Sequence, residues 1–251
     1  MNEMMHFDGS SNQQTNYIKR EQPIYKHPKD EIDDIFHNVL SAFGFSVREE
    51  QIKLSQKMLE GFRKYKVSMN EAEVGTGKSL AYLVAAFVAK TRLNGSGPIT
   101  IATSSIELQN TLITKEIPRL SDMLMASGKI SKPLQAVLRK GKEHYLCYLR
   151  FRDYYEKISQ HKRKYKLLIQ ELNDLDVSSK DTFDLDKTEL RPSVKEKICV
   201  KSGCKDCKYA AECGYQNFLD RARNNSHIFF QVTNHNMYLA SINVVQDNAR
   251  F

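Results

Sequence analysis

The sequence predicts an α/β fold in which a parallel sheet is built around a phosphate-binding loop and is interrupted by a helical, cysteine-rich insertion. Three observations support this prediction. A glycine-containing loop with Lys and Ser runs directly into an apolar helix, short apolar strand patterns alternate with helical ones, and four of the five cysteines gather between residues 199 and 213. Strands that alternate with helices are typical of parallel α/β sheets.

The elements before the loop are two helices and a short strand. Residues 1–28 are rich in Asn, Gln, Ser and charged side chains, and we expect them to form a disordered tail. Apolar residues recur at helical spacing over residues 30–43, and a second helix is expected over residues 48–62. A short strand over residues 65–69 should lead into the phosphate-binding loop.

The loop itself reads A-E-V-G-T-G-K-S, which is the looser form of the phosphate-loop pattern with Ala72 in place of the first Gly. Its backbone N–H groups would face an anion, the Lys78 ammonium would contact the β and γ phosphates, and the Ser79 hydroxyl would ligate Mg²⁺. An ordinary turn is the alternative, but a turn requires neither Lys nor Ser after the second Gly. The residues expected to hold ATP and Mg²⁺ here are Ala72, Glu73, Val74, Gly75, Thr76, Gly77, Lys78 and Ser79.

The apolar run 80–89 should continue as a helix whose dipole favours the same anion. After a Gly-Pro turn, residues 99–103 have a strand pattern that ends at Thr103 and Ser104. Ligands of parallel sheets bind beyond the carboxyl ends of the strands, so these hydroxyls should lie on the same rim as the loop. A helix over residues 107–125 and a third strand over residues 136–138 should follow.

The segment from residue 139 to residue 172 is strongly basic, with ten Lys or Arg against four acids and five interleaved tyrosines. The whole chain has a net charge of +8. Cations beside aromatic rings suit a single-stranded nucleic acid, because cations follow the phosphates and rings stack on bases. A solvated helix with tyrosines packed beneath it explains the pattern equally well. The acidic, turn-rich segment 174–186 that follows is expected to be a loop.

Composition favours a soluble protein of a reducing compartment. The longest apolar run has only ten residues, at 80–89, which is too short to cross a bilayer, and the first residues do not form a leader peptide. We therefore expect a cytoplasmic protein without a membrane partner. Five cysteines are an odd number for a disulfide framework, and their crowding indicates a metal site.

The cysteines are spaced C-x51-C-x4-C-x2-C-x5-C. Four thiolates suit either a tetrahedral zinc ion or an iron-sulfur cluster, and spacing alone does not choose between them. We favour Cys147, Cys204, Cys207 and Cys213 as the ligands. Cys199 is kept as an alternative to Cys204.

The order of these motifs, from about Phe43 to Ala240, resembles the DinG/XPD group of iron-sulfur superfamily 2 DNA helicases, and its bacterial DinG-like branch most closely. The matching segments are Arg48-x-x-Gln51, Glu71-Ala72 with the phosphate loop, Thr103-Ser104 with Leu108-Gln109, Lys140-Gly141-Lys142 before Tyr145-Leu146-Cys147, and the strand Ile228 to Val232 before Thr233-Asn234-His235.

The resemblance implies a RecA-like motor domain, incomplete here, formed by residues 29–139 and 226–251, with residues 140–225 as an iron-sulfur insertion that contacts DNA. It implies that Arg48 and Gln51 read adenine and that the cysteines hold a 4Fe-4S cluster, with zinc as the alternative. It also implies ATP-driven movement on single-stranded or forked DNA in the 5′ to 3′ direction. The residues that would contact DNA are Thr103, Ser104, Gln109, Lys140 and Lys142.

One expected feature of such a helicase is missing from the sequence. No acidic pair that could hold Mg²⁺ and position the attacking water follows an apolar strand, so no catalytic residue is assigned. His235 is expected to have a structural hydrogen-bonding role rather than to act as a base. We therefore expect the amino-terminal part of a helicase that is inactive alone, and a separate chain could supply the rest. A zinc-stapled DNA-binding module with a degenerate phosphate loop, or a phosphate-loop kinase or transferase, are the alternatives.

Overall fold

The structure is a computed structural model, and it describes residues 26–64, 67–93, 97–180, 182–201, 204, 207–224 and 227–245. The predicted tail therefore lies almost entirely outside the described residues, as do residues 246–251 of the predicted motor domain. None of the helices within the described ranges is both long and apolar enough to cross a membrane.

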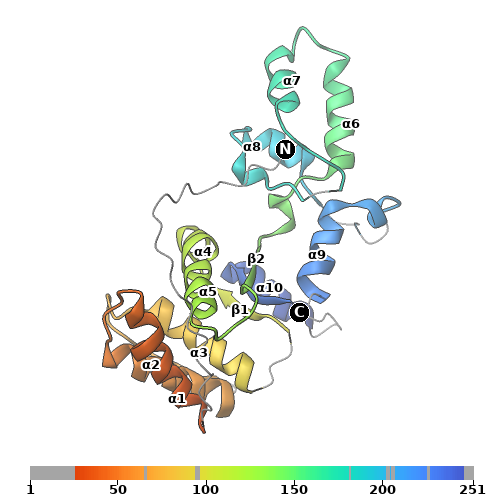
Figure 1. The fold of residues 1–251 in the computed structure, drawn as a ribbon. Coiled ribbons are helices and arrows are strands. Elements are labelled where there is room, and N and C mark those ends of the chain that lie inside the picture. The colour runs from red at the N-terminus through yellow and green to blue at the C-terminus, as the bar shows by residue number, and fades with distance from the viewer. Residues whose placement is uncertain are drawn as a thin grey trace.

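The described strands form one parallel sheet, as the sequence predicts. Its strands are β1 (Ile99–Ala102), β2 (Gln135–Arg139) and β3 (Ile228–Thr233), and they lie in the order β1-β3-β2. β3 thus lies between two strands that come much earlier in the chain. More than a hundred residues separate it from β1, and residues 140–227 separate it from β2. The segment 140–227 is therefore an excursion from the sheet, and Figure 1 shows the helices within residues 148–198 as a lobe beyond β2 and the helix of residues 214–224 running back toward the sheet.

Helices cover the sheet, and their apolar side chains pack with those of the strands to form one hydrophobic core. Every residue from Leu83 to Ala89 is buried, and Phe87 stacks on Phe229 with 5.9 Å between the ring centroids. Phe230, at the centre of β3, is fully buried. The helices of this part are α1 (Pro28–Asp34), its π-helical continuation Ile35–Leu40, α2 (Glu49–Lys64), α3 (Lys78–Arg92), α4 (Ile106–Thr111), the π-helical segment Leu112–Glu116, α5 (Ile117–Ala126) and α10 (His235–Val245).

The helix predicted over residues 107–125 is one continuous rod of α4, a π-helical segment and α5. The change of helix type comes just before Pro118, which lies in the first turn of α5. Proline has no N–H to donate to the preceding turn, so the regular bonding pattern cannot pass through this position.

The strand predicted over residues 65–69 is not formed in its described part. Residues 67–70 have no regular structure, and the side chains of Val67 and Met69 are 80% and 94% exposed. Strand propensity is a weak signal, because a strand forms only when a neighbouring strand offers its backbone groups. No described strand pairs with this segment.

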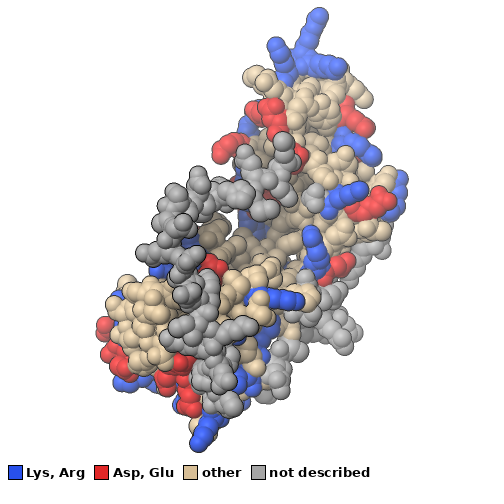
Figure 2. Space-filling view, viewed as in Figure 1, with Lys and Arg blue, Asp and Glu red and all other residues tan. Residues whose placement is uncertain are grey.

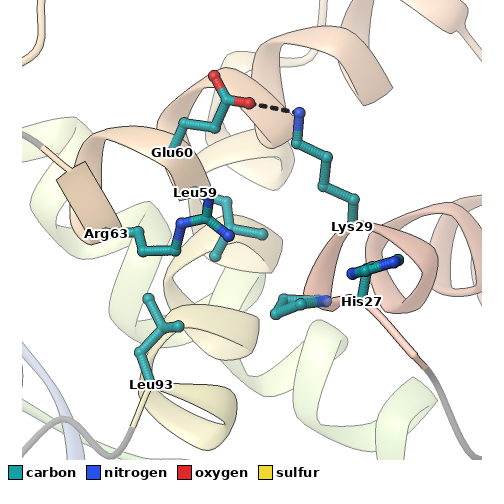
Figure 3. Close-up of a pocket in the computed structure, with 7 residues that line it drawn as sticks. His27, Lys29, Leu59, Glu60, Arg63 and Leu93 are labelled. Carbon is teal, nitrogen blue, oxygen red and sulfur yellow. Dashed lines mark hydrogen bonds and ion pairs between the residues drawn. The ribbon is translucent and has the colours of Figure 1, made fainter.

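A small pocket lies between the start of α1 and the end of α2 (Figure 3). Lys29 and Glu60 close one side of it with an ion pair of 2.5 Å, and Leu59 and Leu93 lie at its base. Its volume of about 110 Å³ is well below the several hundred Å³ typical of a ligand pocket. The pocket lies between two helices and is too small to be an alternative nucleotide site to the phosphate loop.

The excursion has a hydrophobic core of its own. Leu172, Leu185 and Ile198 are buried there, away from the sheet. The extended segment at the start of the excursion is held by a backbone hydrogen bond, in which Leu146 N donates to Phe183 O at 3.0 Å. Its helices are α6 (Tyr148–Ser159), α7 (Lys166–Asn173), α8 (Pro192–Ile198) and α9 (Gly214–Asn224), with 3-10 turns at Lys142–His144, Leu185–Lys187 and Ala210–Glu212.

Candidate nucleotide and cysteine sites

The phosphate loop depends on two glycines with left-handed backbones. Gly75 has φ 88° and Gly77 has φ 83°, and Gly77 caps the start of α3. Side chains are unfavourable in this region of backbone space. A Cβ at Gly77 would in addition collide with the amide nitrogen of Gln51, whereas the space beside Gly75 is open. Gly77 is therefore required both by its backbone and by its neighbour.

The start of α2 holds the loop in place. Gln51 is 6% exposed, and its Nε2 donates a hydrogen bond to Gly77 O at 2.7 Å. Arg48 Nη1 donates to Gly75 O. The structure thus brings the two predicted adenine-reading residues to the carbonyl groups of the loop, where they fix its course.

The loop also folds onto its own lysine. Lys78 Nζ donates to Ala72 O at 2.8 Å and to Glu73 O at 2.6 Å, and Thr76 Oγ1 donates to Glu73 O at 2.7 Å. Ser79 is half-buried in the first turn of α3, while Val74 is fully exposed. The ammonium group is therefore held at the mouth of the loop, directly before a helix of 15 residues whose amino-terminal end favours anions.

The carboxyl end of β1 carries the hydroxyl groups that the sequence predicts on the same rim as the loop. Ser104 is exposed, and Ser105 caps α4 by accepting a hydrogen bond from Leu108 N at 3.1 Å. Gln109 is only 4% exposed and donates to Thr103 O at 3.1 Å. Among the predicted DNA contacts on this rim, Ser104 is accessible and Gln109 supports the turn from below.

The Asn-His turn after β3 closes the same rim. His235 Nε2 lies 3.2 Å from Ala102 O, and Asn234 Oδ1 accepts a hydrogen bond from Met237 N at 2.6 Å. The structural hydrogen-bonding role expected of His235 is confirmed by this contact, which ties the end of β1 to the start of α10.

Four of the five thiols converge on one place in the insertion. Burial raises the pKa of Cys204, and the neighbouring thiols of Cys147, Cys213 and Cys207 raise it further. Cys147, Cys207 and Cys213 line a pocket of about 210 Å³ together with Tyr209 and Arg152. These four cysteines are the four favoured as ligands.

Cys199 lies elsewhere. It is 4% exposed within the hydrophobic core of the insertion, and its Sγ donates to Glu196 O at 3.5 Å in its own helix. Its surroundings are those of a small buried apolar residue.

The four thiols fit a soft metal centre by the chemistry of the donors, because thiolates prefer zinc and iron-sulfur clusters. Within the described ranges, however, no group of three or more His, Cys, Asp or Glu side chains is arranged closely enough to hold a metal ion. Three of these thiols, Cys147, Cys207 and Cys213, line the pocket, and Cys204 lies beside them.

Arg152 and Glu212 both line this pocket, and two lysines act on groups of the site. The charge of Lys142 opposes the rise in the pKa of Cys204. Hydrogen bonds with Lys208 and Arg152 lower the pKa of Tyr209 at the pocket entrance. Positive charge beside thiolates stabilises them.

Lys140, another predicted DNA contact, is engaged within the protein. Its Nζ donates to Asp184 Oδ2 at 2.7 Å and to Asp186 Oδ2 at 2.8 Å, and only 14% of its side chain is exposed. His144 Nδ1 lies 2.9 Å from Asp186 Oδ1. Lys142, by contrast, is exposed.

Sequence reasoning missed the two aspartates. They lie in the segment that reads as an acidic loop, and nothing in the spacing connects residue 184 with residue 140. The local surplus of acid after a basic stretch was the only signal available. In the structure, the two aspartates pair with basic residues that follow β2 and so connect the insertion to the end of that strand. We call this group the β2 ion cluster, and its members are Lys140, His144, Asp184 and Asp186.

Comparisons with known proteins identify helicases as relatives. The chain is 31% identical over 130 residues to the probable ATP-dependent helicase YpvA of Bacillus subtilis, which covers 52% of this chain and 19% of the relative. It is 25% identical over 233 residues to the ATP-dependent helicase DinG of Mycobacterium tuberculosis, which covers 87% of this chain and 34% of the relative. It is 31% identical over 109 residues to the 3′-5′ exonuclease DinG of Bacillus subtilis, covering 43% of this chain and 11% of the relative. No protein-family model matches the chain.

These relatives confirm the resemblance to DinG-like helicases that the order of the motifs indicates. The chain spans between about a tenth and a third of the length of these relatives.

Proposed function

We propose that this chain, a relative of the DinG helicases, is the nucleotide-binding and cysteine-bearing part of an ATP-dependent DNA helicase. The observation that carries the proposal is the phosphate loop. Two left-handed glycines and Lys78 precede the start of a long buried helix, and Arg48 and Gln51 brace the loop from α2.

The proposed binding step is an exchange of hydrogen-bond partners. Lys78 releases the carbonyl groups of Ala72 and Glu73 and turns its ammonium to the β and γ phosphates. The N–H groups at the start of α3 face the same phosphates, and the Ser79 hydroxyl ligates Mg²⁺. Because a hydrogen bond to a charged phosphate is stronger than one to a neutral carbonyl, the exchange favours binding.

The base would lie near Arg48 and Gln51. Both side chains already reach the loop, so a base bound beside them would be read by groups that the phosphates also fix in place. We propose this arrangement as the source of a preference for adenine, with the exposed guanidinium of Arg48 available to stack on or bond to the base.

The four converging cysteines are proposed to hold a 4Fe-4S cluster, with zinc as the alternative. Such a centre would link the start of α6, at Cys147, to the start of α9, at Cys213. The remaining protein groups keep the site partly shielded, since Tyr145 and Tyr215 pack beneath it with 5.2 Å between their ring centroids.

The DNA strand is proposed to follow the rim from Thr103 and Ser104 to Lys142. Two relatives are named ATP-dependent helicases, which supports the proposal that the whole protein acts on DNA, and movement in the 5′ to 3′ direction is part of the same proposal. Hydrolysis would need an acidic pair and a second motor domain, which a further segment or a separate chain would supply. For this chain we propose nucleotide binding without appreciable turnover.

Calorimetric titration with Mg²⁺-ATP tests this function. Wild-type chain is expected to bind, and Lys78→Ala to bind about tenfold to a hundredfold more weakly, because one charged hydrogen-bonding group on the phosphates is lost. Lys57→Ala is the matched control, since Lys57 is an exposed lysine of α2. Equal affinity for the wild type and Lys78→Ala, or no binding by folded wild-type chain, would overturn the proposal.

Metal analysis of anaerobically purified chain tests the cysteine site. A brown protein with about four irons and matching sulfide per chain is expected. A colourless protein with one zinc per chain would support the alternative centre and remove the cluster from the proposal.

A further inference from the structure

The turn between α6 and α7 carries a dense run of positive charge. Residues 157–166 contain five Lys or Arg, one His and no Asp or Glu, and all six of these side chains are exposed. Figure 2 shows Lys and Arg side chains projecting from the end of the molecule where Figure 1 places this turn. We call it the basic turn, and its members are Lys157, His161, Lys162, Arg163, Lys164 and Lys166.

The charge of the basic turn is not neutralised within the described part of the protein. The ion pairs of α6 lie one to two turns earlier, where Arg152 contacts Asp153 at 3.7 Å and Glu156 at 3.8 Å. No described acid comes within ion-pair distance of a cation of the basic turn. Like charges gathered this closely repel one another, so an external anion would lower the free energy of this surface.

The basic turn is held in a fixed shape. His161 N donates to Ile158 O at 3.0 Å, and Lys164 N donates to His161 O at 3.0 Å. Farther down the hairpin, Tyr155 OH donates to Asn173 Oδ1 at 2.7 Å and joins the two helices. A surface whose backbone is already ordered loses less entropy when it binds a partner.

The tyrosines near the basic turn pack against the core, whereas Tyr148, at the opposite end of α6, is 39% exposed. Tyr154, Tyr155 and Tyr165 are half-buried and pack against the core that contains Ile158 and Leu168. Near the basic turn, the tyrosines are thus packed beneath a solvated helix, which is one of the two explanations that the sequence left open. The basic turn therefore offers cations and no exposed ring, which suits phosphates and does not suit the stacking of unpaired bases.

We propose that the basic turn binds the phosphate backbone of double-stranded DNA, as a contact separate from the rim beside the phosphate loop. A duplex carries one negative charge per about 1.7 Å of its axis, the densest regular array of phosphates available to a helicase relative. Because the contact uses charge alone, it does not depend on base sequence or on bound nucleotide.

Fluorescence anisotropy with the full chain and a labelled 20-base-pair DNA duplex tests the proposal across a series of salt concentrations. The test variant is Lys162→Ala/Arg163→Ala/Lys164→Ala. The matched control is Lys53→Ala/Lys57→Ala/Lys64→Ala, which removes three exposed cations from α2 and gives the same net charge. Circular dichroism melting of both variants checks that they are folded.

The test variant is expected to bind duplex about tenfold more weakly than the wild type, with a salt dependence shallower by about two to three units of log Kd against log salt. The control should match the wild type within about threefold. The affinity of the test variant for a single strand of the same length should fall much less than its affinity for the duplex.

Three outcomes would overturn the proposal. Equal weakening in the test and control variants would assign the effect to net charge, and equal weakening for single and double strands would assign the turn to nucleic acid in general. Loss of binding to phosphatidylserine vesicles with duplex affinity unchanged would assign the turn to a membrane surface. Mg²⁺-ATP affinity, measured in the same samples, should be unchanged in the test variant, so that failure of the proposed function and failure of this contact are distinguishable.

Discussion

At the scale of single residues, the phosphate loop shows how much a glycine can determine. Gly75 and Gly77 share the same left-handed backbone, but their surroundings differ, because only Gly77 faces the buried amide of Gln51. The two positions therefore separate the cost of backbone strain from the cost of a steric collision.

Gly77→Ala is expected to reduce the free energy of unfolding by more than Gly75→Ala does. Backbone strain costs about 1 kcal/mol at each position, and displacement of Gln51 adds roughly another 1 kcal/mol at Gly77. Urea unfolding followed by circular dichroism measures both values. Equal losses in the two variants would show that Gln51 moves aside freely.

Lys140 and Lys142 are two lysines of one motif with different surroundings. Lys140→Ala leaves Asp184 and Asp186 without their shared partner, and we expect it to lower the free energy of unfolding by about 1–3 kcal/mol. Lys142→Ala removes an exposed charge and should change stability by less than about 0.5 kcal/mol. Thermal and urea melts of the pair check this, and equal stability would contradict the ion cluster.

At the scale of elements, the insertion consists of a helical core and a cysteine site that share residues 145–147 and 198–200. The backbone bonds Cys147 N to Ile198 O, at 2.8 Å, and Val200 N to Tyr145 O, also at 2.8 Å, place Cys147 and Cys199 on adjacent strand-like segments. Yet the two thiols face different environments, since one lines the pocket and the other is packed in the core.

Single substitutions distinguish the cysteines proposed as metal ligands from the buried Cys199. Cys204→Ala and Cys213→Ala should each lower the bound iron or zinc to well under one centre per chain, because three remaining thiolates do not close a four-ligand site. Cys199→Ala should retain the full metal content and lose only a small packing contribution, about 1 kcal/mol. If Cys199→Ala also loses the metal, the assignment of Cys204 in place of Cys199 is wrong.

The pairing of strands explains why the strand predicted before the loop is absent from the described sheet. Val67 and Met69 have the apolar character of a strand, but they are exposed and the segment pairs with no described strand. β1, with a similarly short pattern, is a strand because β3 accepts it in parallel register, Ile99 opposite Phe230. Pairing, rather than composition, makes the difference.

At the scale of the whole molecule, the β2 ion cluster connects the sheet to the insertion. Burial alone would raise the pKa of Asp186, but its hydrogen bonds with His144 and Lys140 outweigh burial and hold that pKa below the ordinary value. Burial would lower the pKa of Lys140, and its hydrogen bonds with Asp184 and Asp186 raise that pKa overall.

These two pKa shifts determine the pH range over which the β2 ion cluster stabilises the fold. A lowered pKa in the folded state means that Asp186 stabilises the fold fully above its unfolded pKa of about 3.9 and loses this contribution as the pH falls through its folded value. Lys140 stabilises the fold at neutral pH and loses its contribution only as the pH rises through its raised pKa. We expect the cluster to be intact at neutral pH and to weaken below about pH 4.

Tyrosine fluorescence during acid titration measures this, because the chain contains no Trp and Tyr145 bonds to the backbone at Lys140. Asp186→Asn is expected to be less stable than the wild type at pH 7 and to show a weaker dependence on pH between about 4 and 2. Parallel acid titrations of the two proteins would instead indicate that Asp186 contributes nothing to the connection.

Much of this protein was predictable because its signals are local. A loop, the helix after it and a run of apolar residues are all read from neighbouring positions, so the glycine loop before α3 and the parallel α/β class follow from local patterns, whereas the choice of Cys147 over Cys199 does not. The order of motifs then indicated helicase relatives, which the comparisons bear out.

The sequence by itself determined the class of fold, the start of α3 after Gly77 and the set of thiols near one another, since each depends on residues a few positions apart or on a familiar order. Only the tertiary structure decided that β3 lies between β1 and β2, that Lys140 pairs with Asp184 and Asp186, and that Cys199 is buried in a core instead of lining the pocket. Those outcomes depend on contacts between residues far apart in the chain, where burial and pairing outweigh what any residue prefers alone.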